Sequence, residues 1–458
     1  MITSLPESII HVFTLFAPLF SKPVFKNALD LLTAHFLCNS KRTVTNLIRC
    51  MGKQNDSKKF TKYFYILRKA KWSTFQASKL LFLLIINKLL PEDAPIEINI
   101  DSHLNRRRGP KIKGIGKHRD AVASTKSQKV LATGHDWLIA TVSVNIFGTN
   151  YKWSLPFLSY LLTPEKPLTS TRNESDLKGK KRHKKMPKVT CQIIIQIRRW
   201  LGPERKIIVV ADSAFCCREI CRACIKYNVI FCSQLRLDAS LYDFPPAQKA
   251  KRGRPRVVGA RLPNLEELLK DKKQKWITIS VPWYQGGSKI LEVLTGTCLW
   301  YHNTVGGVPI RWVLTRDPKG ERKPMALLIT DLTVCAATAI EYFVGRWPIE
   351  TTFQEINDNF KLETIHTWSD TSINRTAPSI IASYSLACII VSETVKSAGI
   401  EITPQKSAWY EKKTVTFSDV MVYLKLLILN KKYFSQSEKT ATQEKIDLEN
   451  LIYYVASG

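Results

Sequence analysis

Residues 96–101 (IEINID) and residues 206–212 (KIIVVAD) are the two stretches that decide the fold of this chain. The first alternates apolar and polar residues, as a half-buried β-strand does, and the second is a short apolar run of the kind found in buried strands. Each ends on an aspartate, Asp101 or Asp212. Ligands of mixed α/β sheets gather at strand ends, although a strand-terminal aspartate is also a common turn or helix-cap residue.

Further strands and helices flank these two stretches in alternation. Apolar runs predict strands at residues 137–144, 151–156 and 229–233, and helical periodicity predicts helices at residues 189–200 and 218–227. Three strands followed by helix–strand alternation predict a mixed sheet with helices on its faces. The expected fold class is therefore α/β, with a strand order that the pattern leaves open.

The outer parts of the chain have a different character. Apolar residues at helical spacing and many basic residues precede the first strand, which predicts a helical region that contacts DNA or simply presents a solvated basic surface. A basic, proline-rich run and short strand-like pieces follow the last strand, which predicts a β-rich insertion. We divide the chain into a helical amino-terminal region (1–93), a core (94–236 and 308–396), the β-rich insertion with its basic loop (237–307) and a helical carboxy-terminal region (397–458).

The charge of the chain indicates a polyanionic partner. Its 458 residues include 69 lysines and arginines against 38 aspartates and glutamates, a formal net charge of +31. Self-repulsion on this scale opposes compaction unless a polyanion neutralises it. Nucleic acid is the first candidate, because neutralised phosphates release counterions; an anionic membrane surface or a ribosomal partner is the alternative.

Cysteine usage and the apolar segments bear on the cellular compartment. Eleven cysteines cannot all pair, and the amino terminus lacks the pattern of a signal peptide, so we expect free thiols in a reducing cytosol. Cys221 and Cys224 have C-x2-C spacing without a second such pair, which favours buried small side chains over a metal site. The apolar segments at residues 77–90 and 378–395 contain charged or polar residues, so they are expected to be buried helices rather than membrane spans.

Residues 343–353 (FVGRWPIETTF) carry a third acidic candidate. Pro348 suits the first turn of a helix, which places Glu350 in that turn, where the helix dipole favours an anion. Arg346 precedes Glu350 by four residues and has the geometry to hold a phosphate with two hydrogen bonds. Arginine and glutamate at this spacing are more often a surface ion pair.

Together, IEINID, VVADSAF around Asp212 and GRWPIETTF resemble the bacterial insertion-sequence transposases of the DDE class, in particular the group with a β-rich insertion before the catalytic glutamate. The resemblance implies a ribonuclease-H-like core, and it implies that Asp101, Asp212 and Glu350 are catalytic residues that bind the metal. Two-metal phosphodiester chemistry requires separated carboxylates that converge on two cations. The expected cofactors are two Mg²⁺ ions, with Mn²⁺ as a possible substitute.

The glutamate motif of that family is commonly Tyr-x2-Arg-x3-Glu-x6-Lys, and this chain departs from it at two positions. Phe343 stands at the tyrosine position and Asn357 at the lysine position. Tyr342 and Lys361 lie nearby, and Glu355 is a rival to Glu350 as the third ligand. Glu350 is preferred because its spacing from Arg346 matches the family.

Basic and aromatic residues indicate how DNA would be held. A basic, glycine-containing loop directly follows Asp101, and a second basic run resembles an AT-hook, which binds the narrow minor groove. A solvated loop is the alternative for the first run, and general phosphate binding and a plain exposed loop are the alternatives for the second. The tryptophans of the insertion, Trp276, Trp283 and Trp300, are expected to form its core, with stacking on a flipped base as the alternative. With Arg346, the predicted DNA-binding residues are Arg106, Arg107, Arg108, Arg252, Arg254 and Arg256.

The sequence therefore predicts a DNA transposase that cuts at the ends of an insertion sequence and transfers the strand into target DNA. Synapsis of two ends implies a homodimer on DNA, and the expected location is the cytoplasm, associated with the nucleoid. By resemblance, the β-rich insertion suggests a hairpin intermediate. The alternatives are a structure-selective nuclease and a catalytically silent DNA-binding protein derived from a transposase.

Overall fold

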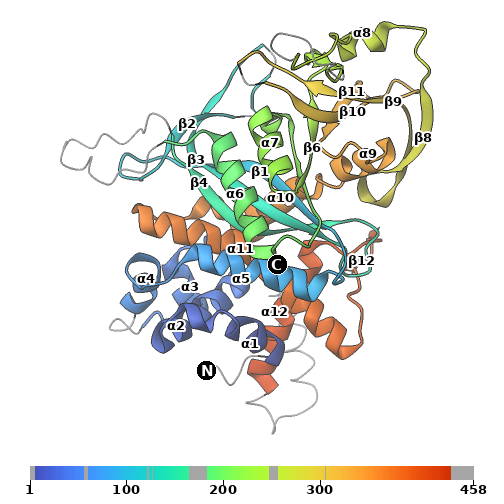
Figure 1. Ribbon diagram of the computed structural model, residues 1–458. Coiled ribbons are helices and arrows are strands. Elements are labelled where there is room, and N and C mark those ends of the chain that lie inside the picture. Colours follow the sequence, from blue (N-terminus) through green and yellow to red (C-terminus); the bar gives the residue numbers. More distant parts are fainter. Residues whose placement is uncertain are drawn as a thin grey trace, which may run out of the picture.

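The predicted α/β class is confirmed by the computed structural model, in which helices surround one large mixed sheet (Figure 1). The helices of the amino- and carboxy-terminal parts gather on one side of the sheet, away from its outermost strands. The structure describes residues 6–55, 60–120, 123–125, 127–164, 183–246, 256–304 and 306–434.

Five strands form the core of the sheet in the order β4-β3-β1-β5-β6. β3 runs antiparallel to both β1 and β4, whereas β5 and β6 run parallel to β1 and to each other. This order and these directions define a ribonuclease-H-like core. A short strand, β2 (Gly116–Arg119), pairs with the start of β3. The five core strands are β1 (Ile96–Arg106), β3 (Leu131–Val144), β4 (Trp153–Leu162), β5 (Ile207–Ala211) and β6 (Ile230–Leu235).

The composition of β5 explains why it lies in the middle of the sheet. All five of its residues are buried, and neighbouring residues face opposite sides. Ile207 and Val209 belong to the main apolar core, while Ile208 and Val210 pack in a second cluster with Ala339 of α9 (Ala336–Val344). Burial of one such side chain contributes roughly 1.5–3 kcal/mol, so a strand covered on both faces is strongly fixed.

The same sheet continues beyond β6 through two strands from the second part of the core (308–396) and strands from the β-rich insertion (237–307), and the sequence pattern did not predict this shared sheet. β11 pairs antiparallel with β6, and β10, β9 and β7 continue outward, with β8 paired to β9. The edge of the core is thereby covered rather than left open. These elements are β7 (Leu241–Tyr242), α8 (Leu265–Lys270), β8 (Ile277–Pro282), η5 (Tyr284–Gly286), β9 (Ser288–Trp300), β10 (Val308–Arg316) and β11 (Met325–Ile329).

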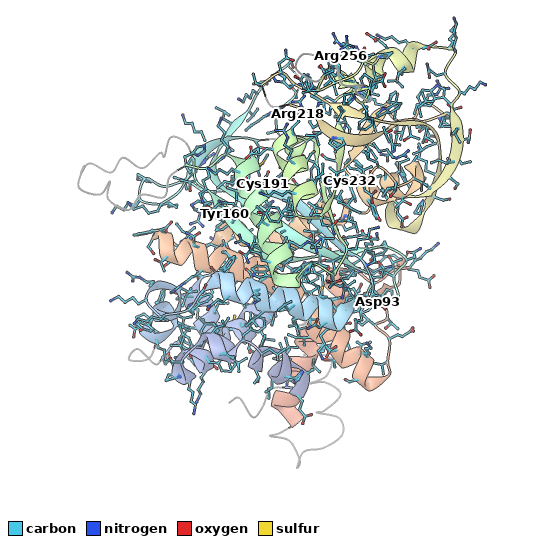
Figure 2. The ribbon with its side chains drawn as sticks, viewed as in Figure 1. Asp93, Tyr160, Cys191, Arg218, Cys232 and Arg256 are labelled. Atoms are coloured by element: carbon cyan, nitrogen blue, oxygen red, sulfur yellow. The ribbon has the colours of Figure 1, made fainter. Side chains whose placement is uncertain are left out.

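The helices predicted within the core are confirmed. α6 (Met186–Leu201) and α7 (Arg218–Lys226) pack against each other, and the buried Cys221 and Cys224 of α7 join the main core. Cys191 on α6 and Cys232 on β6 lie inside the molecule as well (Figure 2). All eleven cysteines fall within the described residues and all are free, as the sequence predicted.

Helices from the two ends of the chain pack together, with α11 in contact with α1, α4, α5 and α12 (Figure 1). Residues 397–434 contain a short hairpin, β12 (Lys406–Ser407) and β13 (Tyr410–Glu411), in addition to the expected helix. The helices of this bundle are α1 (Glu7–Thr14), α2 (Lys22–Leu37), α3 (Val44–Cys50), α4 (Thr61–Arg68), α5 (Thr74–Leu89), α11 (Asp370–Ala398) and α12 (Phe417–Phe434).

α11 is the one helix among the described residues that is long and apolar enough to cross a membrane by length and composition. Of its most apolar window, 61% is buried inside the protein. Ser385 on this helix donates a hydrogen bond to the carbonyl of Pro156 in β4 at 2.7 Å, so the helix is packed onto the sheet. The prediction of a buried core helix here is confirmed.

Asp136 on β3 makes stability depend on pH. Burial raises its pKa to about 6, and His118 Nδ1 lies 3.8 Å from its carboxylate. The folded state therefore favours the protonated acid, so the contribution of Asp136 to stability is present below about pH 4 and is lost as the pH rises through 6. We expect Asp136→Asn to raise the free energy of unfolding at pH 8 by up to roughly 3 kcal/mol, measured by urea denaturation.

The same substitution should give little gain at pH 4, because the wild-type carboxyl is then protonated in the folded state. Asp271→Asn serves as the control, because hydrogen bonds from the Lys273 amide and Gln274 lower the pKa of this carboxyl, so its replacement should not raise the free energy of unfolding at pH 8. An equal gain from Asp136→Asn at both pH values would contradict the assignment.

Candidate active site

The register of two parallel strands brings Asp101 and Asp212 to the same level of the sheet. Ile100 of β1 is paired with Ala211 of β5, and each aspartate is the next residue along its strand. The Asp212 side chain caps η4 (Ser213–Phe215) by accepting from the amide of Ala214 at 2.9 Å. Both aspartates thus lie level with the carboxyl end of β5, where mixed sheets bind ligands. The prediction that Asp101 ends its own strand is wrong, because β1 continues to Arg106 by pairing with β3.

Glu350 lies on a third element, α10 (Pro348–Phe360), which begins close to Asp101. Pro348 lies in the first turn of the helix, and Glu350 is the acidic residue of that turn, as the sequence predicted. A break at Gly345–Trp347 separates α10 from α9. The Glu350 side chain is 42% exposed, so the site opens to solvent on this side.

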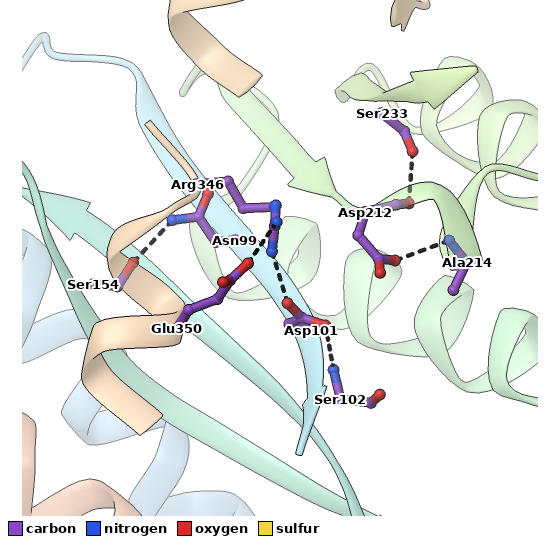
Figure 3. Close-up of polar contacts among 9 residues, drawn as sticks. All are labelled: Asn99, Asp101, Ser102, Ser154, Asp212, Ala214, Ser233, Arg346 and Glu350. Carbon is purple, nitrogen blue, oxygen red and sulfur yellow. Dashed lines mark hydrogen bonds and ion pairs between the residues drawn. The ribbon is translucent and has the colours of Figure 1, made fainter. Parts of the chain in front are cut away.

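Arg346 joins the strand carboxylate to the helix carboxylate (Figure 3). Its Nη1 lies 2.7 Å from Oδ2 of Asp101, and its Nη2 lies 2.9 Å from Oε1 of Glu350. The expected pair with Glu350 is therefore present, but it is half of a three-residue bridge whose other half joins Arg346 to Asp101, 245 positions earlier in the sequence. The guanidinium is 90% buried, since its side chain is only 10% exposed.

Asp101 is a buried carboxylate with both an arginine and other acidic groups around it. Burial raises its pKa to about 7; Arg346 opposes this rise, while Asp212 and Glu350 add to it by charge repulsion. The second oxygen of the carboxylate accepts a hydrogen bond from the amide of Ser102 at 2.8 Å. A carboxyl with a strongly raised pKa that is acted on by two other carboxylates is characteristic of catalytic sites.

A layer of polar contacts beneath the site was not found by the sequence reasoning. Asn99, two residues before Asp101, donates from Nδ2 to the hydroxyls of Ser143 at 2.8 Å and Ser154 at 3.0 Å. Thr352 of α10 donates to the carbonyl of Ser154 at 2.9 Å. These bonds fasten β1 and α10 to the neighbouring strands. The available signal was an asparagine inside an otherwise apolar strand.

The positions that depart from the family motif have identifiable contacts. Asn357 Nδ2 lies 3.4 Å from Nε2 of His103, whose ring packs on Phe353. His103 follows Asp101 by two residues and so shares its face of β1. Glu355, the rival ligand, is hydrogen bonded to Asn359 at 2.8 Å and is not among the groups that act on Asp101.

The basic residues predicted to bind DNA have different surroundings. Arg106 is half exposed and pairs with Asp120 at 2.7 Å. Arg107 is buried and donates to the carbonyl of Thr367 at 3.4 Å, which leaves it little access to a phosphate. Arg108 is exposed. In the AT-hook-like run, Arg256 is exposed and lies beside α8 (Figure 2), whereas Arg252 and Arg254 lie outside the described residues.

An aromatic cluster lies next to Glu350 and joins the β-rich segment to α10. Trp347, at the amino-terminal cap of α10, is 47% exposed, and its ring centroid lies 5.2 Å from that of Tyr284. Trp283 packs on Tyr284 at 4.9 Å, and the guanidinium of Arg322 lies over both rings at 5.1 and 5.3 Å. The sequence reasoning named Trp283 but missed Tyr284, Trp347 and Arg322.

The other two tryptophans of the insertion are held by arginines. Trp300 is buried, and Arg218 lies 4.4 Å over its ring, so it belongs to the core as expected. Trp276 is half-buried beneath Arg316 at 4.1 Å.

The donor chemistry of the site fits a divalent cation. Asp101, Asp212 and Glu350 offer only carboxylate oxygens, which are the ligands that Mg²⁺ and Mn²⁺ prefer. Within the described part of the chain, no three His, Cys, Asp or Glu side chains are grouped so as to hold a metal ion. The positive charge between Asp101 and Glu350 is instead the guanidinium of Arg346.

Comparison with known proteins identifies the family. The model of the DDE superfamily endonuclease family matches residues 15–289, more than half of the chain, and this range includes Asp101 and Asp212. A solved structure, the cryo-EM structure of a piggyBac transposase synaptic complex with hairpin DNA, is 13% identical, with 98% of this chain and 82% of that chain covered and a TM-score of 0.39. No curated protein matches the chain. On the family match, the chain belongs to the DDE superfamily of endonucleases, enzymes that generally use divalent metal ions.

Proposed function

We propose that this endonuclease is a DNA transposase that cuts the ends of an insertion sequence and joins them to target DNA. The observation that supports the proposal is that the carboxylates of Asp212, at the end of β5, and Glu350, at the start of α10, both act by charge on that of Asp101 in β1 of a ribonuclease-H-like sheet. Family membership supports the nuclease chemistry. The net charge of +31 supports a DNA substrate.

The proposed roles follow from the positions of the side chains. Asp101, Asp212 and Glu350 would hold two Mg²⁺ ions, or Mn²⁺ in their place, which when bound supply activation of the attacking oxygen and stabilisation of the leaving one. Arg346, with its two Nη groups already directed at anionic oxygens, would orient the scissile phosphate. Asn99 and Thr352 fix the strands and the helix that carry the carboxylates.

The test is cleavage of the DNA that flanks the gene by the purified full-length protein in Mg²⁺. We expect cutting at one defined position in each terminal inverted repeat, and a joined product when target DNA is added. Cutting without joining, on DNA that lacks inverted repeats, would indicate a structure-selective nuclease instead. Binding without cutting would indicate the catalytically silent relative.

The second candidate function is a catalytically silent DNA-binding protein, because the glutamate motif of this chain departs from the family pattern at two positions. Phe343 and Asn357 replace its tyrosine and lysine, and Asn357 contacts His103 rather than offering a cation. The convergence of all three carboxylates favours the active enzyme over this candidate.

The wider organisation is part of the same proposal. The helical amino-terminal region (1–93) would contact DNA beside the core, with the β-rich segment (237–307) and the carboxy-terminal region (397–458) as further units. Exposed Arg108 and Arg256, together with Arg106, Arg252 and Arg254, would contribute to DNA binding, whereas buried Arg107 would support the loop through its bond to Thr367. Synapsis of two ends would require a homodimer, and the protein would act in the cytoplasm at the nucleoid of a bacterium.

The aromatic cluster supports a step in which a base leaves the helix, as hairpin formation requires. Aromatic rings stack on unpaired bases, and each contact is worth about 1–3 kcal/mol. We expect Trp347→Ala to weaken binding of an end carrying an unpaired base by roughly tenfold to 100-fold, and binding of the fully paired end much less, as measured by fluorescence anisotropy.

Trp409→Ala is the matched control for this prediction. Trp409 is 89% exposed at the tip of the β12–β13 hairpin, so it is the more accessible tryptophan. Equal losses for the two variants, or equal losses on the two DNAs, would argue against base stacking at Trp347.

A further inference from the structure

Arg346 occupies the place between Asp101 and Glu350 where a cation is needed. Its two Nη groups take one oxygen from each carboxylate, at 2.7 and 2.9 Å. Its Nε is buried without a hydrogen-bond partner among the described residues. The guanidinium is always protonated, so in this state it supplies the positive charge that offsets two neighbouring anions.

Arg346 and a divalent cation would compete at these carboxylates, because two positive charges beside the same oxygens repel each other. Oδ2 of Asp101 is bonded to Arg346, and Oδ1 accepts from the Ser102 amide, so both oxygens of this carboxylate are engaged. On Glu350 it is Oε1 that accepts from Arg346. A metal that uses Oδ2 of Asp101 and Oε1 of Glu350 would lie beside the guanidinium, so repulsion between the two cations favours displacement of Arg346.

A DNA phosphate is the partner that would draw Arg346 away. The guanidinium fork binds a phosphate with two parallel hydrogen bonds, as it binds carboxylates. Glu350, the outer member of the bridge, is 42% exposed, whereas Asp101 is 15% exposed, so an incoming phosphate reaches the Glu350 side first. The exchange of one anion for another keeps the arginine charge paired throughout.

We propose that Arg346 is an internal cation that keeps the carboxylates closed to metal until DNA binds. This inference rests on the proposed function and adds an order of events, in which DNA takes Arg346 and the metal then takes the carboxylates. By linkage, metal and DNA each tighten the binding of the other by the same factor. The ion pairs of Arg346 with Asp101 and Glu350 would thereby prevent a metal-loaded nuclease site from forming in the absence of DNA.

The test is Mn²⁺ binding to the full-length protein, followed by electron paramagnetic resonance, without DNA and with a duplex of the gene's own flanking sequence. We expect the duplex to tighten Mn²⁺ binding by about tenfold or more in the wild type. Arg346→Gln, which removes the charge, is expected to bind Mn²⁺ about tenfold more tightly than the wild type without DNA. In this variant the effect of DNA should largely disappear.

Three controls separate the possible outcomes. Arg199→Gln removes one exposed positive charge on α6, outside the proposed DNA-binding residues, and should leave DNA-free Mn²⁺ binding unchanged. Asp101→Asn should abolish Mn²⁺ binding, which would assign the bound Mn²⁺ of the wild type to this site. Arg346→Lys keeps the charge but lacks the fork that spans both carboxylates, so it should fall between wild type and Arg346→Gln, which also covers the case in which the glutamine variant folds poorly.

Unchanged DNA-free Mn²⁺ affinity in both Arg346 variants would overturn the inference, as would wild-type binding that is equally tight with and without DNA. Failure of the proposed function would look different. In that case the DNA-free comparison of wild type with Arg346→Gln would still show the shift, while cleavage and joining would be absent.

Discussion

Asp101→Asn is expected to lower the rate of metal-dependent DNA cleavage on the order of 1,000-fold or more, because it removes a charged oxygen from the site that holds the cations. The substitution is close to isosteric, and its remaining carbonyl oxygen can still accept from Arg346, which now donates to Oδ2 at 2.7 Å. The rate is measured in single turnover with a labelled end duplex in Mg²⁺.

The Tm of the variant distinguishes a loss of catalysis from a loss of folding. Burial already raises the pKa of Asp101 to about 7, so a neutral side chain suits the folded protein and the Tm should not fall. Asp238→Asn, on an exposed carboxylate paired with Arg236, is the control and should cleave at the wild-type rate. Cleavage by Asp101→Asn at the wild-type rate and position would remove Asp101 from the catalytic set.

Phe360→Ala is expected to lower the free energy of unfolding by about 3–5 kcal/mol. Phe360 is fully buried at the end of α10, with ring centroids 4.7 Å from His35, 6.3 Å from Phe36 and 5.7 Å from Phe417. The ring therefore joins the helix of Glu350 to α2 and α12, and its loss leaves a cavity that three separate elements line. Urea denaturation followed by tryptophan fluorescence measures the change.

An exposed phenylalanine provides the comparison. Phe244 is 42% exposed, and Phe244→Ala should change the free energy of unfolding by no more than about 0.5 kcal/mol. A loss below about 1 kcal/mol for Phe360→Ala would mean that the seam between α10 and the amino-terminal helices closes over the missing ring or contributes little to stability.

The core strands and helices could be predicted because their signals are local. The apolar runs at β1 and β5 and the helical period of α6 and α7 lie within short windows, and each predicted element is present. The continuation of the sheet from β6 into β11 and β10 could not be predicted in this way. An alternating or apolar pattern predicts that a segment is a strand, but it does not predict which other strand will pair with it.

At the site too, contacts between residues close in sequence could be predicted, whereas contacts between distant segments could not. The spacing of Arg346 and Glu350 predicts their ion pair, since both lie near one helix start. It says nothing of Asp101, because that contact depends on how α10 packs on β1. Likewise, Trp347 and Tyr284 come from segments 63 positions apart, counted as 347 − 284, and only folding brings their rings to 5.2 Å.

The sequence by itself determined the α/β class, the strands that lead to Asp101 and Asp212, and the helix start that carries Glu350, because local periodicity and turn chemistry encode these features. Only the tertiary structure decided that Arg346 bridges two of the carboxylates, that Asn99 and Thr352 fasten their supports, and that an aromatic cluster borders the site. These contacts arise from the packing of segments far apart in the chain, and no local pattern records that packing.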